Sequence, residues 1–511
     1  MKSIRFSRRT LRCAALLTLL LPSASFLITW LRPVLGLPMA AALLAAFAFY
    51  VRAGAAPARD VFGHEEDVFE CPLSVFSLVC LCALLWTFLS GIGGLFYQTE
   101  DHYGRNAIFS DMLYHTWPVY FEGTSSALTY YIAYWLLPAL AAKGAAALFG
   151  TGALWPAANA ALFVQTLWFL VLALLLFLSL VRAKGLIKNA LGLLLFVFFS
   201  GMDALMIPWF PNWWNNQLEW WAQGYQFSSN TTGLFWVYNQ ALPAWLAMAL
   251  LLDHPEDTGS FALIGLCAFP FSPMPFIGLM VYFIGLAVVK GIALTRERGA
   301  AGGIRALLFS CLTARNLLAC VSIAPAFIPY FMANAASDGA PFRFDIYAGA
   351  YGAFGAVARL ALFLIIEFGA FALILLPRFR KNPAFLLTAL SLILAPMFRI
   401  GYAQDFSMRA SIPGLMALCL FCGRYLLAEK GVRRAAAIAL TCLLLIGSVT
   451  PMMEFVRGAY KVKKAGTIFL TANPFKTVLH PEADTYNFIC EDVADAVFYR
   501  YLAKPDVSGA D

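Results

Sequence analysis

Ionisable side chains gather in one hydrophilic segment, residues 98–122 (QTEDHYGRNAIFSDMLYHTWPVYFE), between two long apolar runs. Its adjacent carboxylates, Glu100 and Asp101, could act as a general base on an acceptor hydroxyl or hold a divalent cation, Mg²⁺ or Mn²⁺, against a phosphate. Polar residues are costly in membrane-embedded sequence, so such a cluster predicts a functional site. The alternative is a solvated loop at a membrane surface. The other candidates in the segment are His102, Arg105, Asn106 and Asp111.

Arg105 follows Asp101 at the i,i+4 spacing that places two side chains on one helix face. The same spacing recurs in the segment QDFSMRASIP, where Asp405 precedes Arg409 between two apolar runs. The guanidinium group of arginine can bind phosphate through two parallel hydrogen bonds (bidentate binding). Arg409, Arg105 and Arg399 are therefore candidate phosphate ligands. Asp405 would support Arg409. In each pair the alternative is an ordinary ion pair that neutralises a loop.

A tryptophan-rich segment, residues 208–221 (PWFPNWWNNQLEWW), and two amides in the next apolar run, Asn239 and Gln240, are further polar candidates. Aromatic faces stack on sugar rings, but tryptophans also form belts at membrane boundaries, and the belt is favoured here. Amides within a span usually hydrogen-bond a neighbouring helix. Gln240 is retained as a supporting residue of the site.

The composition places these candidates in a membrane protein. Of the 511 residues, 61% are hydrophobic and 13% are charged, and the mean hydropathy is +0.74. Soluble proteins carry about 25% charged residues. The net charge of +8 comes from short basic clusters between apolar runs. This pattern indicates membrane topology and no nucleic-acid partner.

Long apolar runs predict an all-α polytopic membrane protein with about 13 transmembrane helices. The predicted transmembrane domain covers residues 1–453, and a small outer-side tail covers residues 454–511. Residues 97–156 are predicted to form a large outer loop with interfacial helices, because the run 128–148 contains a proline, a lysine and crowded aromatic residues. Five basic clusters then share one side, the first within residues 2–12 and the second within residues 182–188. This predicts a cytoplasmic N-terminus, a plasma-membrane location and a candidate site on the outer face. A further cluster, Arg457, Lys461, Lys463 and Lys464, disagrees, because it would lie outside.

Three features together carry a family resemblance: the acidic motif in the first large outer loop, the segment TYYIAYWLLPALAAKGAAALFG behind it, and many spans whose outer loops face one site. They resemble the GT-C superfamily of integral membrane glycosyltransferases, which use polyprenyl-phosphate-linked sugars. The segment is similar to the tyrosine-rich, lysine-containing interfacial segment of members that transfer aminoarabinose or mannosylate proteins. The motifs RNAIFSD, LFWVYNQALPAW and DFSMRASIP also look like an uncharacterised group of bacterial multi-pass membrane proteins.

The resemblance implies a fold, a reaction and roles for particular residues. It implies a GT-C-like bundle in a lipid bilayer, a polyprenyl-phosphate sugar donor, and a glycan, lipid or protein acceptor in the cell envelope. Asp101 would be the base or metal ligand, supported by Glu100 or Asp111, and Arg409 would bind the donor phosphate. The acceptor hydroxyl would attack the anomeric carbon as the lipid phosphate leaves. The acidic pair is followed here by His102, which departs from the family's pattern and leaves the need for a metal open.

Two other functions remain open at this point. A flippase or transporter of an amphipathic lipid-linked substrate would use the helix broken by Pro270, Pro273 and Pro275, and it predicts an internal repeat that the sequence does not display. A non-catalytic partner in envelope assembly predicts tolerance of substitutions in both acidic loops.

Overall fold

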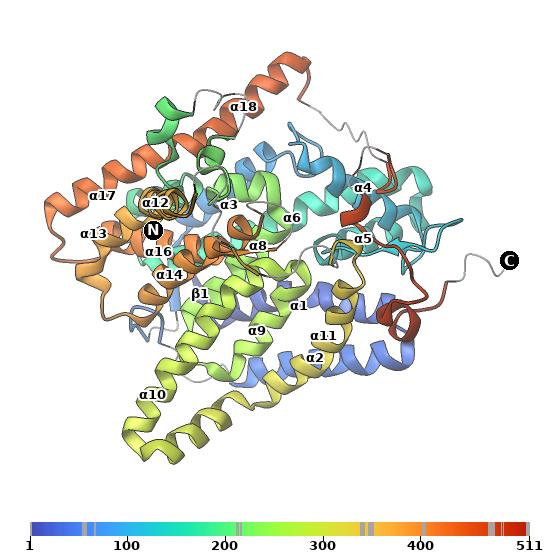
Figure 1. Cartoon of the computed structure of the whole chain (residues 1–511), viewed down its shortest axis with the longest axis horizontal. Coiled ribbons are helices and arrows are strands. Elements are labelled where there is room, and N and C mark those ends of the chain that lie inside the picture. Colours follow the sequence, from blue (N-terminus) through green and yellow to red (C-terminus); the bar gives the residue numbers. More distant parts are fainter. Residues whose placement is uncertain are drawn as a thin grey trace.

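The computed structural model describes residues 3–53, 59–65, 68–210, 214, 217–337, 343–345, 352–400, 405–468, 476–481, 483 and 485–506, most of them in α-helices (Figure 1). The bounds in the first half of the chain are α1 Arg8–Trp30, α2 Pro33–Ala53, α3 Leu73–Leu89, α4 Asp101–Tyr114, α5 Ala133–Phe149, α6 Leu154–Val181, α7 Leu186–Val197, α8 Asn230–Asp253 and α9 Phe261–Ala268. In the second half they are α10 Pro273–Cys311, α11 Ala314–Met332, α12 Gly352–Leu364, α13 Ala370–Phe379, α14 Pro383–Leu394, α15 Asp405–Ala410, α16 Ile412–Leu427, α17 Arg434–Gly447 and α18 Val449–Ala465.

Eight helical stretches in the described chain are long and apolar enough to cross a membrane. They are Arg8–Trp30, Pro33–Ala53, Thr151–Val181, Asn230–Asp253, Pro273–Cys311, Ala314–Met332, Phe354–Phe379 and Arg434–Ala465. The other apolar helices are shorter, at 10–17 residues. An all-α, multi-pass membrane architecture is therefore confirmed. A span needs about 20 apolar residues, and the shorter helices fall below that length. The predicted number of about 13 crossings therefore stays a prediction.

α8 lies inside the bundle, packed against α1, α6, α9, α10 and α16 (Figure 1). In its most apolar stretch of 18 residues, 94% is buried inside the protein, which is the largest buried share among the candidate spans. Ser229 caps its first turn, since the Ser229 hydroxyl accepts a hydrogen bond from the Thr232 N–H. The helix is broken at Val237 (φ −135°, ψ 40°). Pro243 follows in the next turns, and its ring and missing N–H disturb the turn before it.

The bundle has two ends, which the direction of α1 defines. α1 begins at Arg8, whose guanidinium bonds Asp253, the last residue of α8. It ends at Trp30, whose ring lies 6.4 Å from that of Trp117, beyond α4. A helix of 23 residues is about 34 Å long, close to the thickness of a membrane. We call these the Arg8 end and the Trp30 end. In Figure 1, β1 lies toward the left, and α4, α5 and the C-terminus lie toward the right.

Members of the predicted basic clusters meet at the Arg8 end. Arg8, from the first cluster, and Arg182, from the second, both form ion pairs with Asp60. Arg424 donates to the carbonyl of Val181, beside Arg182. Segments that are distant in sequence thus present cations at one end, as the charge pattern predicts. Which side of the membrane this end occupies stays a prediction.

The interfacial position predicted for the run 128–148 stays a prediction, and within the bundle α5 packs against α6. The Tyr134 hydroxyl lies 2.9 Å from that of Thr166, and Gln165 donates to the Tyr134 carbonyl at 2.7 Å. Thr166 lies about 18 Å along the axis of α6 from its first residue, Leu154. The first turn of α5 packs at this height, and α5 runs alongside the first half of α6. The reason is burial, because Tyr134, Trp135 and Leu136 are fully buried.

Within the described residues, short antiparallel strand pairs connect distant segments: β1 (Ser3–Ser7) with β2 (Val68–Pro72), β3 (Ala127–Leu128) with β6 (Ile489–Cys490), and β4 (Arg343–Phe344) with β5 (Phe398–Arg399). The β3–β6 pair holds the C-terminal tail against the large loop at the Trp30 end. The Tyr120 hydroxyl donates to the Lys504 carbonyl at 2.8 Å, and Ala503 bridges to Leu31. Loop and tail thus form one layer over this end.

Candidate functional site

Asp101 and Arg105 form an ion pair in the first turns of α4. Arg105 Nη2 lies 2.9 Å from Asp101 Oδ2. The Asp101 side chain is 41% exposed, but that of Arg105 is only 5% exposed. Arg105 Nε and Nη1 are buried and have no hydrogen-bond partner within the described chain. The carboxylate therefore reaches the surface, and the buried guanidinium has donors left for a ligand.

Asp405 and Arg409 repeat this arrangement in α15. Arg409 Nη1 lies 2.6 Å from Asp405 Oδ1, with side-chain exposures of 12% for Arg409 and 45% for Asp405. Arg409 Nε is buried and has no partner among the residues described. Gln226, in the loop before α8, donates its backbone N–H to Ser407 Oγ at 3.4 Å. α15 itself packs against α10 and α16.

The charges of both ion pairs act on the phenol of Tyr130, which precedes α5. Burial raises the pKa of Tyr130, and the positive charges of Arg105 and Arg409 oppose that rise. The charges of Asp101 and Asp405 add to it. Charge interactions of this kind decline with distance. Two segments about three hundred residues apart in sequence therefore lie within electrostatic range of one side chain. The i,i+4 motifs alone could not show this.

His102 joins α4 to the break in α8. The His102 Nε2–H donates to the Phe235 carbonyl at 3.0 Å, and the Thr99 hydroxyl donates to the same oxygen at 3.4 Å. Burial, with help from the positive charge of Arg105, lowers the pKa of His102 to about 3. The ring is therefore neutral at physiological pH. It lies 5.5 Å from the ring of Tyr238, which also lies 5.8 Å from the Arg105 guanidinium carbon.

Asn239 and Gln240 directly follow Tyr238. They are 0% and 1% exposed, respectively. All four heteroatoms of their side-chain amides lack a hydrogen-bond partner among the described residues. Buried polar atoms in proteins almost always have a partner, so unpaired amides beside a candidate site indicate that a ligand or water completes them. Gln240, predicted as a supporting residue, is therefore a candidate ligand contact, and Asn239 joins it.

The other predicted residues have different surroundings. Glu100 is exposed at the start of α4. Asn106 donates to Gln98 Oε1 at 2.9 Å and holds the loop. Arg399, in β5, pairs with Asp345 at 3.4 Å. The segment QDFSMRASIP begins with Gln404, which lies outside the described residues.

Asp111 lies ten residues after Asp101 on α4, a rise of about 15 Å, so the structure does not bring the two carboxylates together. Asp111 Oδ2 instead accepts a hydrogen bond from the Val478 N–H at 2.9 Å. Burial raises the pKa of Asp111 to about 6. The contact ties the tail to α4. Among the residues described, no three His, Cys, Asp or Glu side chains are grouped so that they could hold a metal ion.

A buried group of carboxylates was not recognised from the sequence. Asp203, Glu219 and Glu367 are each 2% exposed or less. Trp221 Nε1 lies 3.1 Å from both Asp203 and Glu367. The indole N–H of Trp221 thus bridges the two carboxylates. Burial, followed by the charge of Asp203, raises the pKa of Glu219 to about 7. The sequence feature that could have indicated this buried group is Glu367, because it is the one carboxylate in the apolar run 354–379.

Comparisons with models of protein families, with curated proteins and with solved structures found no match. The case for a function therefore depends on the residues and their geometry.

Proposed function

We propose that this protein is a membrane glycosyltransferase, similar to the GT-C superfamily, that moves a sugar from a polyprenyl-phosphate donor to a cell-envelope acceptor. The observation that carries the proposal is that the charges of two Asp–Arg pairs, distant in sequence, act on one buried phenol, that of Tyr130. Each pair combines a buried guanidinium that has unpaired N–H groups within the described chain with a carboxylate open to solvent. A phosphate would satisfy the cations, and a carboxylate would be left to accept a proton.

In this mechanism Arg409 and Arg105 bind the donor phosphate by charge-assisted hydrogen bonds, which are stronger where water is excluded. Asp101 accepts the proton of the acceptor hydroxyl while the hydroxyl oxygen attacks the anomeric carbon. The bond from that carbon to the phosphate oxygen breaks, and the lipid phosphate leaves with the electron pair. Both guanidiniums stabilise the charge that develops on it. Asp405 positions Arg409.

Two further features support the proposal. The amides of Asn239 and Gln240 offer donors and acceptors of the kind that sugar hydroxyls pair with. The cations at the Arg8 end suit a cytoplasmic face, because basic residues accumulate there in membrane proteins. The Trp30 end, with the loop and the tail, would then face outward from the plasma membrane.

The test uses the full-length protein in liposomes with a panel of radiolabelled polyprenyl-phosphate sugars and envelope acceptors. We expect labelled product from the wild type and none from Asp101→Asn, which keeps the shape of the side chain but cannot accept the proton. Glu122→Gln, an exposed position in the same loop, is the matched control and should retain transfer. Transfer retained by a folded Asp101→Asn would remove the assignment of the base, and transfer absent with every donor would count against the whole proposal.

A second candidate, transport of an amphipathic lipid-linked substrate, is favoured by one observation. Glu367 lies in a π-helical turn, Ile365–Gly369, within a candidate span, and the Trp221 N–H bridges it to Asp203. π-turns are frequent at functional sites, and protonatable carboxylates inside membranes mark proton relays. The same liposomes separate the two functions. Substrate that crosses the bilayer without covalent change, in a manner abolished by Glu367→Gln, would favour transport.

A further inference from the structure

The buried carboxylates of Asp203, Glu219 and Glu367 have no cationic partner. Each of these residues is 2% exposed or less. No ion pair within the described chain includes any of the three. An ionised carboxylate that is buried without a partner is so costly that the group is neutralised instead. A cation therefore compensates at least part of this charge.

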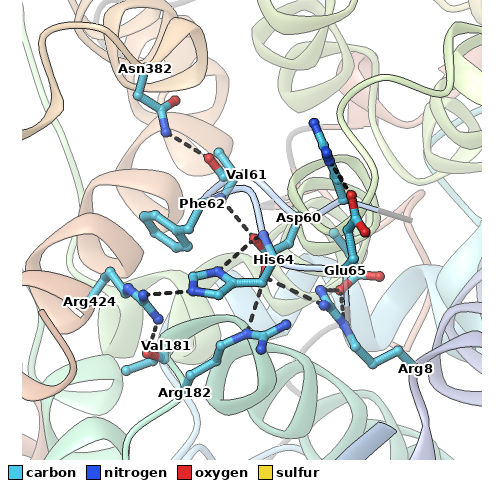
Figure 2. A network of polar contacts seen from close by, with 12 residues as sticks. Arg8, Asp60, Val61, Phe62, His64, Glu65, Val181, Arg182, Asn382 and Arg424 are labelled. Atoms are coloured by element: carbon cyan, nitrogen blue, oxygen red, sulfur yellow. Dashed lines mark hydrogen bonds and ion pairs between the residues drawn. The ribbon is translucent and has the colours of Figure 1, made fainter. Parts of the chain in front are cut away.

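A buried carboxylate elsewhere in the protein is compensated by arginine. Asp60 is 3% exposed, and its Oδ2 lies 3.5 Å from Arg8 Nη1 and 3.3 Å from Arg182 Nε (Figure 2). The three carboxylates without a cationic partner instead accept hydrogen bonds from hydroxyl, amide, backbone and indole groups. Such donors orient a carboxylate but bring no full positive charge to it.

Glu367 has the fewest hydrogen-bond donors of the three. Glu219 accepts hydrogen bonds from an amide, a hydroxyl and a backbone N–H, and Asp203 accepts them from two hydroxyls and the Trp221 indole. Glu367 accepts only the Trp221 N–H, on Oε1, and its buried Oε2 has no partner in the described chain. Hydrogen bonds to a carboxylate favour its ionised form. Glu367 is therefore the group best neutralised by a proton.

The neighbouring carboxylates strengthen this assignment. Trp221 Nε1 lies 3.1 Å from Asp203 Oδ1 and 3.1 Å from Glu367 Oε1, so these two oxygens are at most twice that distance apart. Asp203 and Glu219 both act on Glu367 by charge. Like charges this close in a buried site disfavour each other, and such a pair binds and releases protons as one unit.

Glu367 lies where two candidate spans meet the segment 200–203. It belongs to the π-helical turn Ile365–Gly369 of the span Phe354–Phe379. A Cβ on Gly201 would lie 2.0 Å from Glu367 Oε2, so this oxygen packs directly against the segment. The Thr450 hydroxyl, from the first turn of α18, donates to Asp203 Oδ2 at 2.9 Å. The charge state of Glu367 therefore bears on contacts between the two spans.

We propose that Asp203 and Glu367 form a proton-binding site between these two spans, with the proton on Glu367. The proton removes one of two neighbouring negative charges and allows the π-helical turn, the segment 200–203 and the start of α18 to pack together. The site requires neither the sugar donor nor the acceptor of the proposed reaction, and a proton bound here need not cross the membrane. Failure of this proposal therefore does not imply failure of the proposed transfer, or the reverse.

The test is infrared spectroscopy of the full-length protein in a detergent without ester groups, because the C=O stretch of a protonated carboxyl group is separate from the bands of a carboxylate. At about pH 8 ordinary carboxyl groups are ionised, and Glu219, with a pKa of about 7, is mostly ionised. We expect the band in the wild type and its loss in Glu367→Gln. Asp203→Asn removes the neighbouring charge, so the band should disappear at a pH lower by about two pH units, as for unit charges about 6 Å apart in a protein interior.

Glu454→Gln is the matched control. Glu454 is 6% exposed and accepts an indole N–H, from Trp236 at 2.9 Å, but its Oε1 also pairs with Arg457 at 2.5 Å. Because the arginine compensates its charge, Glu454→Gln should leave the band unchanged.

Three results would overturn the proposal. A wild type without the band would mean that both carboxylates are ionised and that another cation compensates them. A band that survives in a folded Glu367→Gln protein, or that is lost in Glu454→Gln, would assign the proton to another group. Unfolding temperatures establish that each variant is folded. If Glu367→Gln does not fold, the wild-type spectrum and the response to Asp203→Asn still decide the question.

Discussion

Replacing Arg409 tests the proposed phosphate site without knowledge of the sugar. All donors of the proposed class share polyprenyl phosphate, which is also the leaving product, so binding of polyprenyl phosphate alone is the quantity to measure. We compare Arg409→Lys and Arg409→Gln with the wild type. Lysine keeps the positive charge but lacks the planar guanidinium group with its several N–H donors, whereas glutamine lacks both the charge and that group.

The expected magnitude follows from the contacts of Arg409. Its Nη1 is engaged with Asp405 at 2.6 Å, and its buried Nε has no partner in the described chain. A phosphate oxygen on Nε would form one charge-assisted hydrogen bond, and such bonds contribute about 1.5–3 kcal/mol. Arg409→Gln should therefore raise the Kd for polyprenyl phosphate about tenfold to 150-fold. Arg409→Lys should recover part of that loss.

The assay is titration of polyprenyl phosphate into the detergent-solubilised protein, followed by calorimetry or fluorescence. Arg315→Gln is the matched control, because Arg315 also pairs with an aspartate, Asp257 at 2.9 Å, and its side chain is 13% exposed, close to the 12% of Arg409. Arg315→Gln should leave the Kd unchanged. An unchanged Kd in a folded Arg409→Gln protein, or equal losses in both variants, would refute the assignment of Arg409.

Two further predictions concern stability. Because His102 has a folded pKa of about 3 against about 6.5 when unfolded, the unfolded chain binds the extra proton between these values, and stability should fall by about 2 kcal/mol from pH 8 to pH 5. Thermal unfolding of His102→Gln should show a smaller acid dependence, and an identical dependence would contradict the burial argument. A Cβ on Gly36 would lie 2.0 Å from the Leu27 carbonyl oxygen, so Gly36→Ala should destabilise the α1–α2 hairpin by about 1–3 kcal/mol. At Gly144, where a Cβ meets nothing within 4 Å, the same change should be tolerated, and equal unfolding temperatures for the two variants would count against the close approach.

The sequence determined the class of the protein and its local pairs. Apolar runs of span length require a membrane, and the helices α1, α2, α6 and α8 lie where those runs are. The spacing of Asp101 to Arg105 and of Asp405 to Arg409 determined both ion pairs, because i,i+4 residues share a helix face whatever surrounds the helix. Local periodicity carries this information without reference to any other segment.

Contacts between distant segments were decided by the tertiary structure. Packing of α4 and α5 against the broken α8, and of α15 against α10 and α16, brings both ion pairs within electrostatic range of Tyr130. The same packing sends Asp111 to the tail at Val478, although Asp111 and Asp101 share a helix. It also brings Glu367 and Asp203 to one indole N–H, that of Trp221, which an isolated carboxylate in an apolar run did not reveal. The physical reason is that a partner distant in sequence is set by how whole helices fit together, and no local spacing specifies that fit.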